Sequence, residues 1–258
     1  MKYNTLQVKT QGNLALLTLT RPRNGNPVDD ALAGELDDAC RTLNEDDCIH
    51  AVILTGSPRG PFSLGEDLSA PRPTDVELPH PPPASTACRA VASLKCPVIA
   101  ALGGDATGAG LELAMSCDIR IVSATARLSL PQVVNGVMPS GGGTQQLPRL
   151  VGKGKAIELL LLGGAIDANE ALRIGLVNEI AAPSKLTKRA NEMAQVILSR
   201  GPIGVRYAKE AVGKGMDMTL AQGLRLEADL NIILQTTFDR AEGVNAFMEK
   251  RKAHFKGV

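Results

Sequence analysis

The 258-residue sequence has no tryptophan, two tyrosines, four phenylalanines and three histidines. So few aromatic rings argue against a base-stacking surface for nucleic acid, and so few histidines argue against a catalytic triad or a histidine-rich metal site. Lysine and arginine together number 28 against 27 aspartates and glutamates, which leaves no positive excess for a phosphate backbone. We therefore expect neither a nucleic-acid partner nor a bound metal.

Cysteines are few, and membrane signals are missing. The five cysteines form no C-x-x-C pair, and an odd number of them at irregular spacing is typical of free thiols in a reducing compartment. The N-terminus has no apolar segment of the signal-peptide type. The apolar run 157–162 is interrupted by Glu158 and is far shorter than the roughly 20 residues a spanning helix needs. The sequence thus predicts a cytoplasmic protein with no membrane partner.

What the chain does have is a large aliphatic content, 44% hydrophobic residues in all, enough for one large domain with or without an appendage. Apolar bursts on either side of Gly12-Asn13 predict a β-hairpin over 6–20. Asp29 and Asp30 are candidate N-caps for a helix that runs to Leu43. Buried strands are expected at 51–55, 97–102 and 118–123. Helices are expected to end near Lys95 and to span 109–117. This alternation indicates an α/β core.

The remaining segments of the sequence show other patterns. Prolines crowd the stretch 68–84, so most of it can be neither helix interior nor central strand. After Gly143 the pattern becomes helical, and we expect an all-helical C-terminal third. Its predicted helices are 153–162, 168–174, 183–200, 203–214, 220–235 and 240–250.

Three glycine-rich loops, at 103–110, 141–143 and 152–154, are the first candidates for chemistry. None fits a phosphate cradle: Gly152-Lys153 is followed by glycine rather than serine or threonine, and the glycines at 108 and 110 lack the spacing of a dinucleotide fingerprint. Tight turns are the plain alternative for all three.

The first loop passes from Gly108 directly into the expected helix. The N–H of Ala109 would then be one of the unpaired donors at a helix N-terminus, and Glu112 would follow on the same face. An N–H donor and a carboxylate would then converge on one small ligand. The alternative is that Glu112 only complements the helix dipole. A second N–H donor is expected where a strand breaks at Gly65, although a plain β-turn is the alternative there.

Together these segments resemble the crotonase superfamily, the enoyl-CoA hydratase/isomerase family, over nearly the whole chain. The similar segments are Arg21-Pro22 with Asn26, 51–56 followed by 62–67, 97–101 continuing through 108–114 to Cys117-Asp118, 139–150, and 247–252.

The resemblance implies a spiral of ββα units over 1–200, a helical trimerisation region over 201–258, and acyl-CoA substrates bound by a homotrimer or a dimer of trimers. Coenzyme A would enter as part of the substrate, with no other cofactor. The backbone N–H groups of Glu66 and Ala109 would form the oxyanion hole, and Glu112 would be an acid/base catalyst. Further substrate-binding positions carried over from the motifs are Asn26, Pro27, Gly65, Asp67, Leu68, Gly108, Ser140, Phe247 and Lys250, the last two serving a neighbouring subunit's coenzyme A.

The chain departs from the family pattern at three positions. Gln132 stands where hydratases carry a second glutamate, and an amide can hydrogen-bond but cannot exchange a proton. Glu66 stands where the family commonly has alanine or glycine, and Pro27 where it prefers alanine. Two ways to replace the missing carboxyl are open: Glu112 acts alone with Gln132 orienting water, or Glu66 supplies the second carboxyl. We expect an enzyme of enoyl-CoA hydratase type. The alternatives are another reaction of the family (decarboxylation, isomerisation or thioester hydrolysis) and a degenerate acyl-CoA-binding protein.

Overall fold

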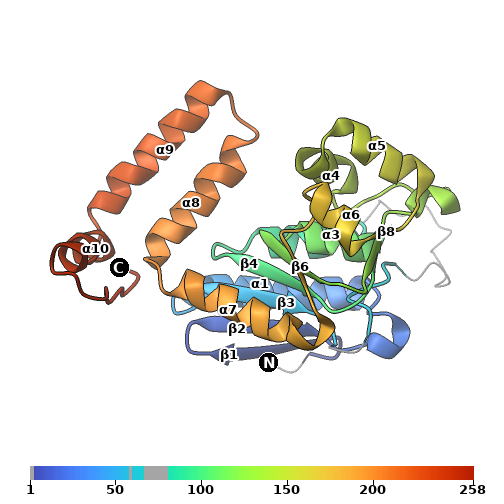
Figure 1. Cartoon of the computed structure of the whole chain (residues 1–258), viewed down its shortest axis with the longest axis horizontal. Helices are drawn as coiled ribbons and strands as arrows, with labels where there is room; N and C mark the ends of the chain where they lie inside the picture. Colours follow the sequence, from blue (N-terminus) through green and yellow to red (C-terminus); the bar gives the residue numbers. More distant parts are fainter. Residues whose placement is uncertain (1–2, 58–59, 67–80) are drawn as a thin grey trace.

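A computed structural model covers the chain and describes residues 3–57, 60–66 and 81–258. Its centre is a six-stranded sheet in the order β1-β2-β3-β4-β6-β9, seen at the base of Figure 1. The first two strands are antiparallel, and every later pair is parallel. The strands are β1 (Leu6–Gln11), β2 (Leu14–Leu19), β3 (Ala51–Thr55), β4 (Val98–Leu102), β6 (Ile119–Ser123) and β9 (Glu179–Ala181).

Side chains of the parallel strands alternate between two hydrophobic clusters. In β3, Val52 and Leu54 face one cluster, which includes residues of α1 (Asp30–Glu45) and α2 (Pro83–Ala92). Ala51 and Ile53 face the other, which includes residues of α7 (Leu186–Leu198). Because both faces are covered, these strands are continuously apolar, as expected of a parallel sheet. The predicted α/β core, hairpin and Asp29-capped helix are confirmed.

A smaller layer lies above the carboxyl ends of the main strands (Figure 1). It contains a three-stranded sheet in the order β5-β7-β8. Its elements are β5 (Ala106–Thr107), α3 (Ala109–Met115), β7 (Arg127–Ser129), α4 (Gly143–Val151), α5 (Lys153–Leu162), β8 (Ile166–Asp167) and α6 (Ala168–Arg173).

The expectation of an all-helical C-terminal third is wrong in two places, because β8 and β9 are strands. Strand β9 pairs with β6 and completes the main sheet, and β8 pairs with β7. Each has only two or three residues, too few to show a period of two in the sequence. Their partners, remote along the chain, impose the extended backbone.

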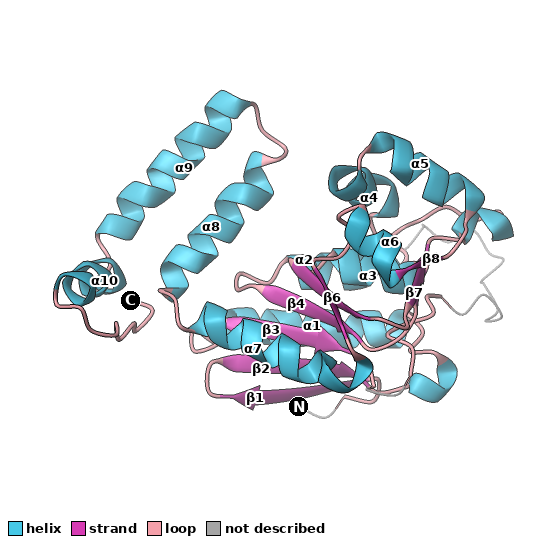
Figure 2. Ribbon diagram, in the orientation of Figure 1, coloured by secondary structure: helices cyan, strands magenta, loops and turns pink. Residues whose placement is uncertain are grey.

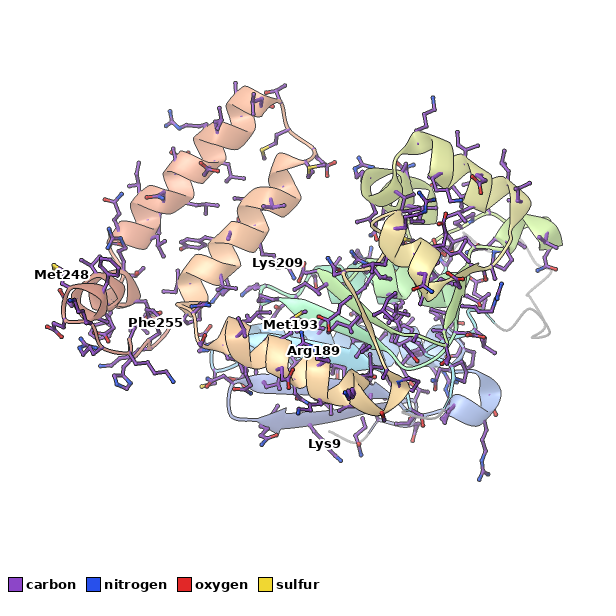
Figure 3. The ribbon with its side chains drawn as sticks, viewed as in Figure 1. Lys9, Arg189, Met193, Lys209, Met248 and Phe255 are labelled. Carbon is purple, nitrogen blue, oxygen red and sulfur yellow. The ribbon has the colours of Figure 1, made fainter. Side chains whose placement is uncertain are left out.

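The last three helices extend away from the sheet, as Figure 2 shows. They are α8 (Pro202–Gly215), α9 (Leu220–Gln235) and α10 (Phe238–Met248). Lys209 of α8, labelled in Figure 3, ties this arm to the core: its Nζ lies 2.7 Å from a carboxylate oxygen of Asp118 and donates to the Cys96 carbonyl. In α9 no residue is buried. Among the residues described, no helix has the length and apolar character needed to cross a bilayer.

Helix α3 packs so closely against Ser63 that no side chain fits at Gly110. A Cβ there would lie 2.3 Å from the Ser63 carbonyl oxygen. We expect Gly110→Ala to lower the free energy of unfolding by about 1 to 3 kcal/mol, the usual cost of overpacking. Urea denaturation at fixed protein concentration would measure it.

The matched control is Gly34→Ala, an exposed glycine within α1 whose Cβ would meet nothing within 4 Å. Here the same substitution should stabilise by about 0.5 to 1 kcal/mol, because glycine loses more backbone entropy in a helix than alanine does. Equal urea midpoints for the two variants would contradict the close packing of α3.

Candidate active site

Helix α3 starts at a glycine whose conformation other residues rarely adopt. Gly108 has φ 54° and ψ −126°, and its N–H donates to the Ser129 carbonyl. The next N–H, that of Ala109, has no acceptor among the described residues. It is therefore an available donor at the start of a helix.

The segment of Gly65 lies directly against this donor. Gly65 has φ 90°, and a Cβ on it would lie 3.2 Å from the Ala109 nitrogen and 2.7 Å from the Thr107 carbonyl oxygen. Only glycine permits this contact. Because of this contact, the segments of Glu66 and Ala109 lie side by side. These are the two segments predicted to supply the oxyanion donors. Whether both N–H groups serve one oxyanion stays a prediction.

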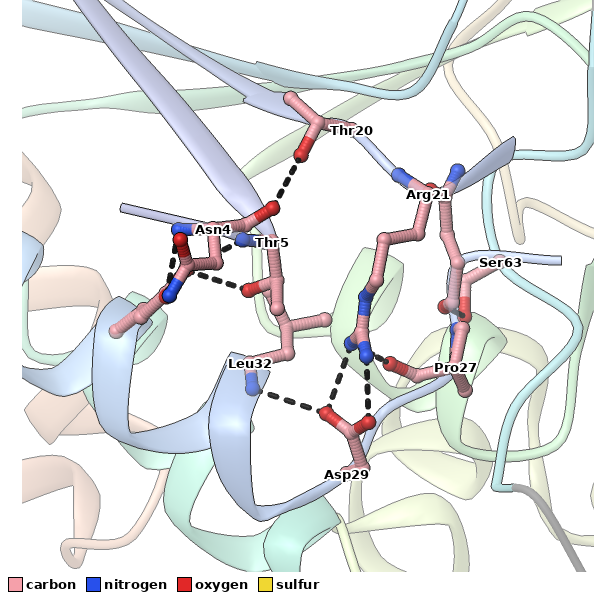
Figure 4. A network of polar contacts seen from close by, with 10 residues as sticks. Asn4, Thr5, Thr20, Arg21, Pro27, Asp29, Leu32 and Ser63 are labelled. Atoms are coloured by element: carbon pink, nitrogen blue, oxygen red, sulfur yellow. Dashed lines mark hydrogen bonds and ion pairs between the residues drawn. The ribbon is translucent and has the colours of Figure 1, made fainter. Parts of the chain in front are cut away.

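A polar network holds the segment before α1 against Ser63 (Figure 4). Asn26 has φ 47°, and its carboxamide accepts from the Arg21 N–H and donates to the Phe62 carbonyl. Ser63 Oγ donates to the Asn26 carbonyl, and Arg21 makes a bidentate ion pair with Asp29. The Asn26 side chain is only 1% exposed. The Asn26 side chain holds the segment that carries half-buried Pro27, and its predicted part in substrate binding stays a prediction.

Glu112 is 1% exposed and is held by three donors. Its Oε1 accepts from the N–H groups of Gly141 at 2.8 Å and Gly143 at 2.7 Å. Its Oε2 accepts from Gln132 Nε2 at 3.1 Å. Burial raises the pKa of the Glu112 carboxyl, and the main-chain N–H groups oppose that rise without cancelling it. A raised pKa moves a carboxyl toward the range in which it can both take up and release a proton.

The second glycine-rich loop is a cradle for this carboxylate, and not only the tight turn that its glycines predict. A Cβ on Gly143 would lie 3.0 Å from Glu112 Oε1, and one on Gly141 would lie 2.7 Å from the Sγ of Cys88. The clustering of three glycines was the only signal in the sequence. Because the cradle and Glu112 lie on different elements, no local motif links them.

Gln132 opens a 3-10 helix, Gln132–Asn135, and lies beside Glu112 as its place in the motif predicts. Its Nε2 donates a hydrogen bond to Glu112 Oε2. Its Oε1 is buried and has no hydrogen-bond partner among the described residues. Buried acceptors are usually satisfied. The side chain therefore offers an acceptor to a ligand O–H or N–H next to the carboxylate.

Two more predicted residues meet at this site. Ser140 Oγ donates a long hydrogen bond, 3.4 Å, to Glu66 Oε1. The Glu66 charge adds a smaller contribution to the raised pKa of Glu112, after burial. Asp67 and Leu68, with most of the proline-rich stretch, lie outside the described residues.

Phe247 and Lys250 are not part of this cluster within one chain. Helix α10 lies at the opposite end of the molecule from α3 and α4 (Figure 1). Phe247 is 85% exposed, and Lys250 follows the helix with φ 53°. Their predicted contact with coenzyme A stays a prediction that requires a second subunit.

Comparisons with known proteins agree over nearly the whole length. The family model described as "Enoyl-CoA hydratase/isomerase" matches residues 9–258. A probable enoyl-CoA hydratase of Rhizobium meliloti is 41% identical, and a crotonyl-CoA hydratase of Syntrophomonas wolfei is 37% identical; each alignment covers 99% of both chains. The crystal structure of an enoyl-CoA hydratase from Bacillus anthracis superposes with a TM-score of 0.93 at 37% identity, over 99% of this chain and 100% of that one.

The raised pKa of Glu112 predicts a pH-dependent cost to folding. Below the pKa of glutamate in the unfolded chain, both states are protonated and the cost is zero; as the pH rises through the higher folded-state pKa, the wild type loses stability. Glu112→Gln keeps an oxygen for Gly141 and Gly143 and cannot ionise. We expect its advantage in free energy of unfolding to be absent near pH 4 and to grow toward neutral pH.

Chemical denaturation at a series of pH values would test this expectation. Glu45→Gln is the control, because Glu45 is exposed at the end of α1, and its effect should be small and flat with pH. A stability difference for Glu112→Gln that stays constant across the range would show that burial does not penalise this carboxylate.

Proposed function

This chain belongs to the enoyl-CoA hydratase/isomerase family and has its crotonase-like α/β fold, and from that premise we propose that it hydrates an enoyl-CoA thioester with Glu112 as its one acid/base residue. The observation that carries the proposal is the buried Glu112 carboxylate, fixed on one oxygen by two main-chain N–H groups. Its other oxygen adjoins the Gln132 carboxamide.

The thioester carbonyl would be bound by the N–H groups of Ala109 and Glu66. Support comes from the Ala109 N–H, which has no acceptor among the described residues, and from the close approach of Gly65 to it. Preorganised donors stabilise the negative charge that develops on the carbonyl oxygen, and each is typically worth a few kcal/mol of barrier. Because the donor at residue 66 is the main chain, its unusual side chain does not remove it.

The reacting water would lie between Glu112 Oε2 and Gln132 Oε1. It would donate one O–H to each, which satisfies the buried amide oxygen. As the water oxygen bonds to C3, Glu112 takes its proton, and the C2–C3 π electrons move into the thioester as an enolate. Glu112 then returns that proton to C2, so one carboxyl serves as base and as acid. Gln132 acts by hydrogen bonding alone.

A second candidate function rests on the same Gln132. A site with one titratable carboxyl beside an oxyanion hole also suits another reaction of the family, such as decarboxylation, isomerisation or thioester hydrolysis. A protein that binds acyl-CoA without turning it over is the remaining alternative. Release of CO₂ or free thiol from malonyl-, methylmalonyl- or β-ketoacyl-CoA would identify the first, and tight calorimetric binding without turnover the second.

We also propose that the chain forms a homotrimer, alone or paired into a hexamer, with 201–258 as the helical assembly region. Support comes from the exposed apolar side chains of α9, among them Leu220, Leu224 and Ile232. An apolar cavity of about 530 Å³ opens between α8, α9 and α10, and Phe247 lines it. In the assembly, Phe247 and Lys250 would contact a neighbour's coenzyme A. The proposal requires no cofactor beyond the substrate's own coenzyme A, and it includes a cytoplasmic location.

The catalytic proposal predicts how crotonyl-CoA hydration responds to substitution. Glu112→Gln should lower kcat by about 100- to 10,000-fold, the usual worth of a general acid/base. Gln132→Met, which removes hydrogen bonding at similar size, should lower it by about 10-fold or less. Gln132→Glu should bring no large gain. Loss of the enoyl-thioester absorbance and chromatography of the 3-hydroxyacyl-CoA product would measure these rates.

One pattern would overturn hydration as the native reaction: an inactive wild type together with an active Gln132→Glu. That result would place residue 132 at the reacting carbons and leave the natural amide serving another chemistry. Circular dichroism of every variant would show that a lost rate does not reflect lost folding.

Light scattering during gel filtration would test the assembly. We expect a mass of about three or six times the 27.1 kDa chain. Leu224→Glu, which places a charge on the exposed apolar side of α9, should lower that mass because burying an unpaired charge in an interface is costly. Glu227→Gln, on the same helix, is a neutralising control. A monomeric wild type at micromolar concentration would contradict the trimer.

A further inference from the structure

The C-terminal segment 251–258, here called the tail, folds back on α10, where two buried carboxylates hold it. Asp239, only 4% exposed, accepts the N–H groups of Lys256 at 2.6 Å and Gly257 at 3.0 Å. The Asp239 N–H in turn donates to the Val258 carbonyl. Main-chain donors satisfy the charge of this buried carboxylate, and they fix the path of the end of the tail at the same time.

Glu242, three residues further along α10, holds the start of the tail. It is 9% exposed, accepts the His254 N–H at 2.7 Å and forms a bidentate ion pair with Arg251 at 2.6 and 2.9 Å. The hydrogen bonds from Arg251 lower the pKa of the Glu242 carboxyl to about 2, so it stays ionised in any ordinary assay. Between the two anchors the Phe255 ring, labelled in Figure 3, lies 3.5 to 3.6 Å from the positions that a Cβ on Gly201 or Gly243 would take.

The junction between α10 and the tail is a lysine in a conformation that favours glycine. Lys250 has φ 53°. Its N–H donates to the Phe247 carbonyl, and the Arg251 N–H donates to the Ala246 carbonyl. This is the hydrogen-bond pattern of a helix end at which glycine is the usual residue. A longer residue is strained there and persists only where the surrounding contacts impose the conformation, and the Glu242–Arg251 ion pair is such a contact, one residue away.

The groups left exposed at this junction suit a ligand that is both anionic and aromatic. Phe247 is 85% exposed, and an exposed ring can stack on a base. Lys250 and Lys252 are exposed, and among the described residues neither forms an ion pair. Arg251, between them, is already paired with carboxylates of α10 and its C-terminal end. The two lysines are therefore the cations available to a phosphate.

We propose that Asp239 and Glu242 are positioning residues for the nucleotide of coenzyme A. By clamping the tail they hold Lys250 in its left-handed conformation, from which its ammonium would bind the phosphates of a neighbouring subunit's substrate. This inference rests on the proposed function, which brings Phe247 and Lys250 to that coenzyme A. It goes further because it gives two buried carboxylates, which do not touch the ligand, a part in its affinity, and because it explains why a lysine occupies a position typical of glycine.

Two substitutions that remove the same charge test this role, because positioning and plain electrostatics predict opposite results. Glu242 and Glu249 both accept from Arg251, but Glu249 is exposed. If these carboxylates acted only through their charge, replacing either by glutamine would favour an anionic ligand and lower KM. Positioning instead predicts that Glu242→Gln raises KM for crotonyl-CoA by about 10-fold, the effect of a binding conformation kept by about a tenth of the molecules. In Glu242→Gln kcat should not change, and Glu249→Gln should not raise KM.

Crotonyl-pantetheine, which has the thioester but lacks the nucleotide, separates nucleotide binding from the reaction. Glu242→Gln and Asp239→Asn should leave kcat/KM for this substrate unchanged, and light scattering should give each variant the mass of the wild type. Equal losses with both substrates, or an equal rise of KM in Glu249→Gln, would overturn the inference. A lower mass would also overturn it, because the tail would then serve assembly instead.

Lys250→Gly tests the junction without changing either carboxylate. Glycine adopts φ 53° readily, so the urea midpoint should rise, whereas loss of the ammonium should raise KM for crotonyl-CoA by about 10- to 100-fold, the worth of a hydrogen bond to a charged group. Lys252 is not in the left-handed region, so Lys252→Gly should not raise the midpoint. A Lys250→Gly variant with an unchanged KM, or with a lower midpoint than the wild type, would contradict the proposal.

Binding keeps the inference apart from the hydratase proposal. If the wild type hydrates neither substrate, calorimetry with butyryl-CoA and butyryl-pantetheine still measures what the nucleotide contributes to affinity. Tighter binding of the coenzyme A ester that is lost in Glu242→Gln and kept in Glu249→Gln would support the positioning role and reject only the reaction. Equal affinities of the two esters for the wild type would overturn the positioning role.

Discussion

The burial of the Glu112 carboxylate is the constraint on which the rest of the site depends. An ionised group at 1% exposure is stable only with close donors, and here the N–H groups of Gly141 and Gly143 supply them. Gly141 lies just before α4 and Gly143 is its first residue, and α3 approaches Ser63 so closely that residue 110 has no room for a side chain. The buried carboxylate therefore lies between α3, which carries it, and the start of α4, which supplies its main-chain donors.

Holding the carboxylate and activating it are opposed requirements, and the structure meets both. Three hydrogen bonds favour the ionised form, whereas burial disfavours it more strongly, so the pKa of Glu112 rises. All of the main-chain donors are on Oε1, which leaves Oε2 to Gln132 and to a reactant. One oxygen therefore fixes the position of the group, and the other adjoins Gln132, where the proposed reaction would use it.

Sequence patterns predicted the parts of this molecule whose cause is local. Turn residues predict the hairpin at Gly12-Asn13, capping predicts the start of α1 after Asp29, and length predicts helix α9. Strand β9 and the glycine cradle could not be predicted in this way, because remote partners define them: β6 for the strand and Glu112 for the glycines. The motif resemblance did identify Glu112 and Gln132 as neighbours. It could not indicate that Ser140 connects Glu66 to the cradle.

Two of the three departures from the family pattern, Glu66 and Gln132, make physical sense as a pair. With glutamate at both 66 and 132, the site would hold three carboxylates including Glu112, and like charges placed close together oppose each other's ionisation. An amide at 132 removes one charge and donates a hydrogen bond to Glu112 Oε2. Glu66 can then remain as a second carboxylate, displaced toward Ser140. On this view Gln132 is the substitution that lets the site tolerate a carboxylate at residue 66.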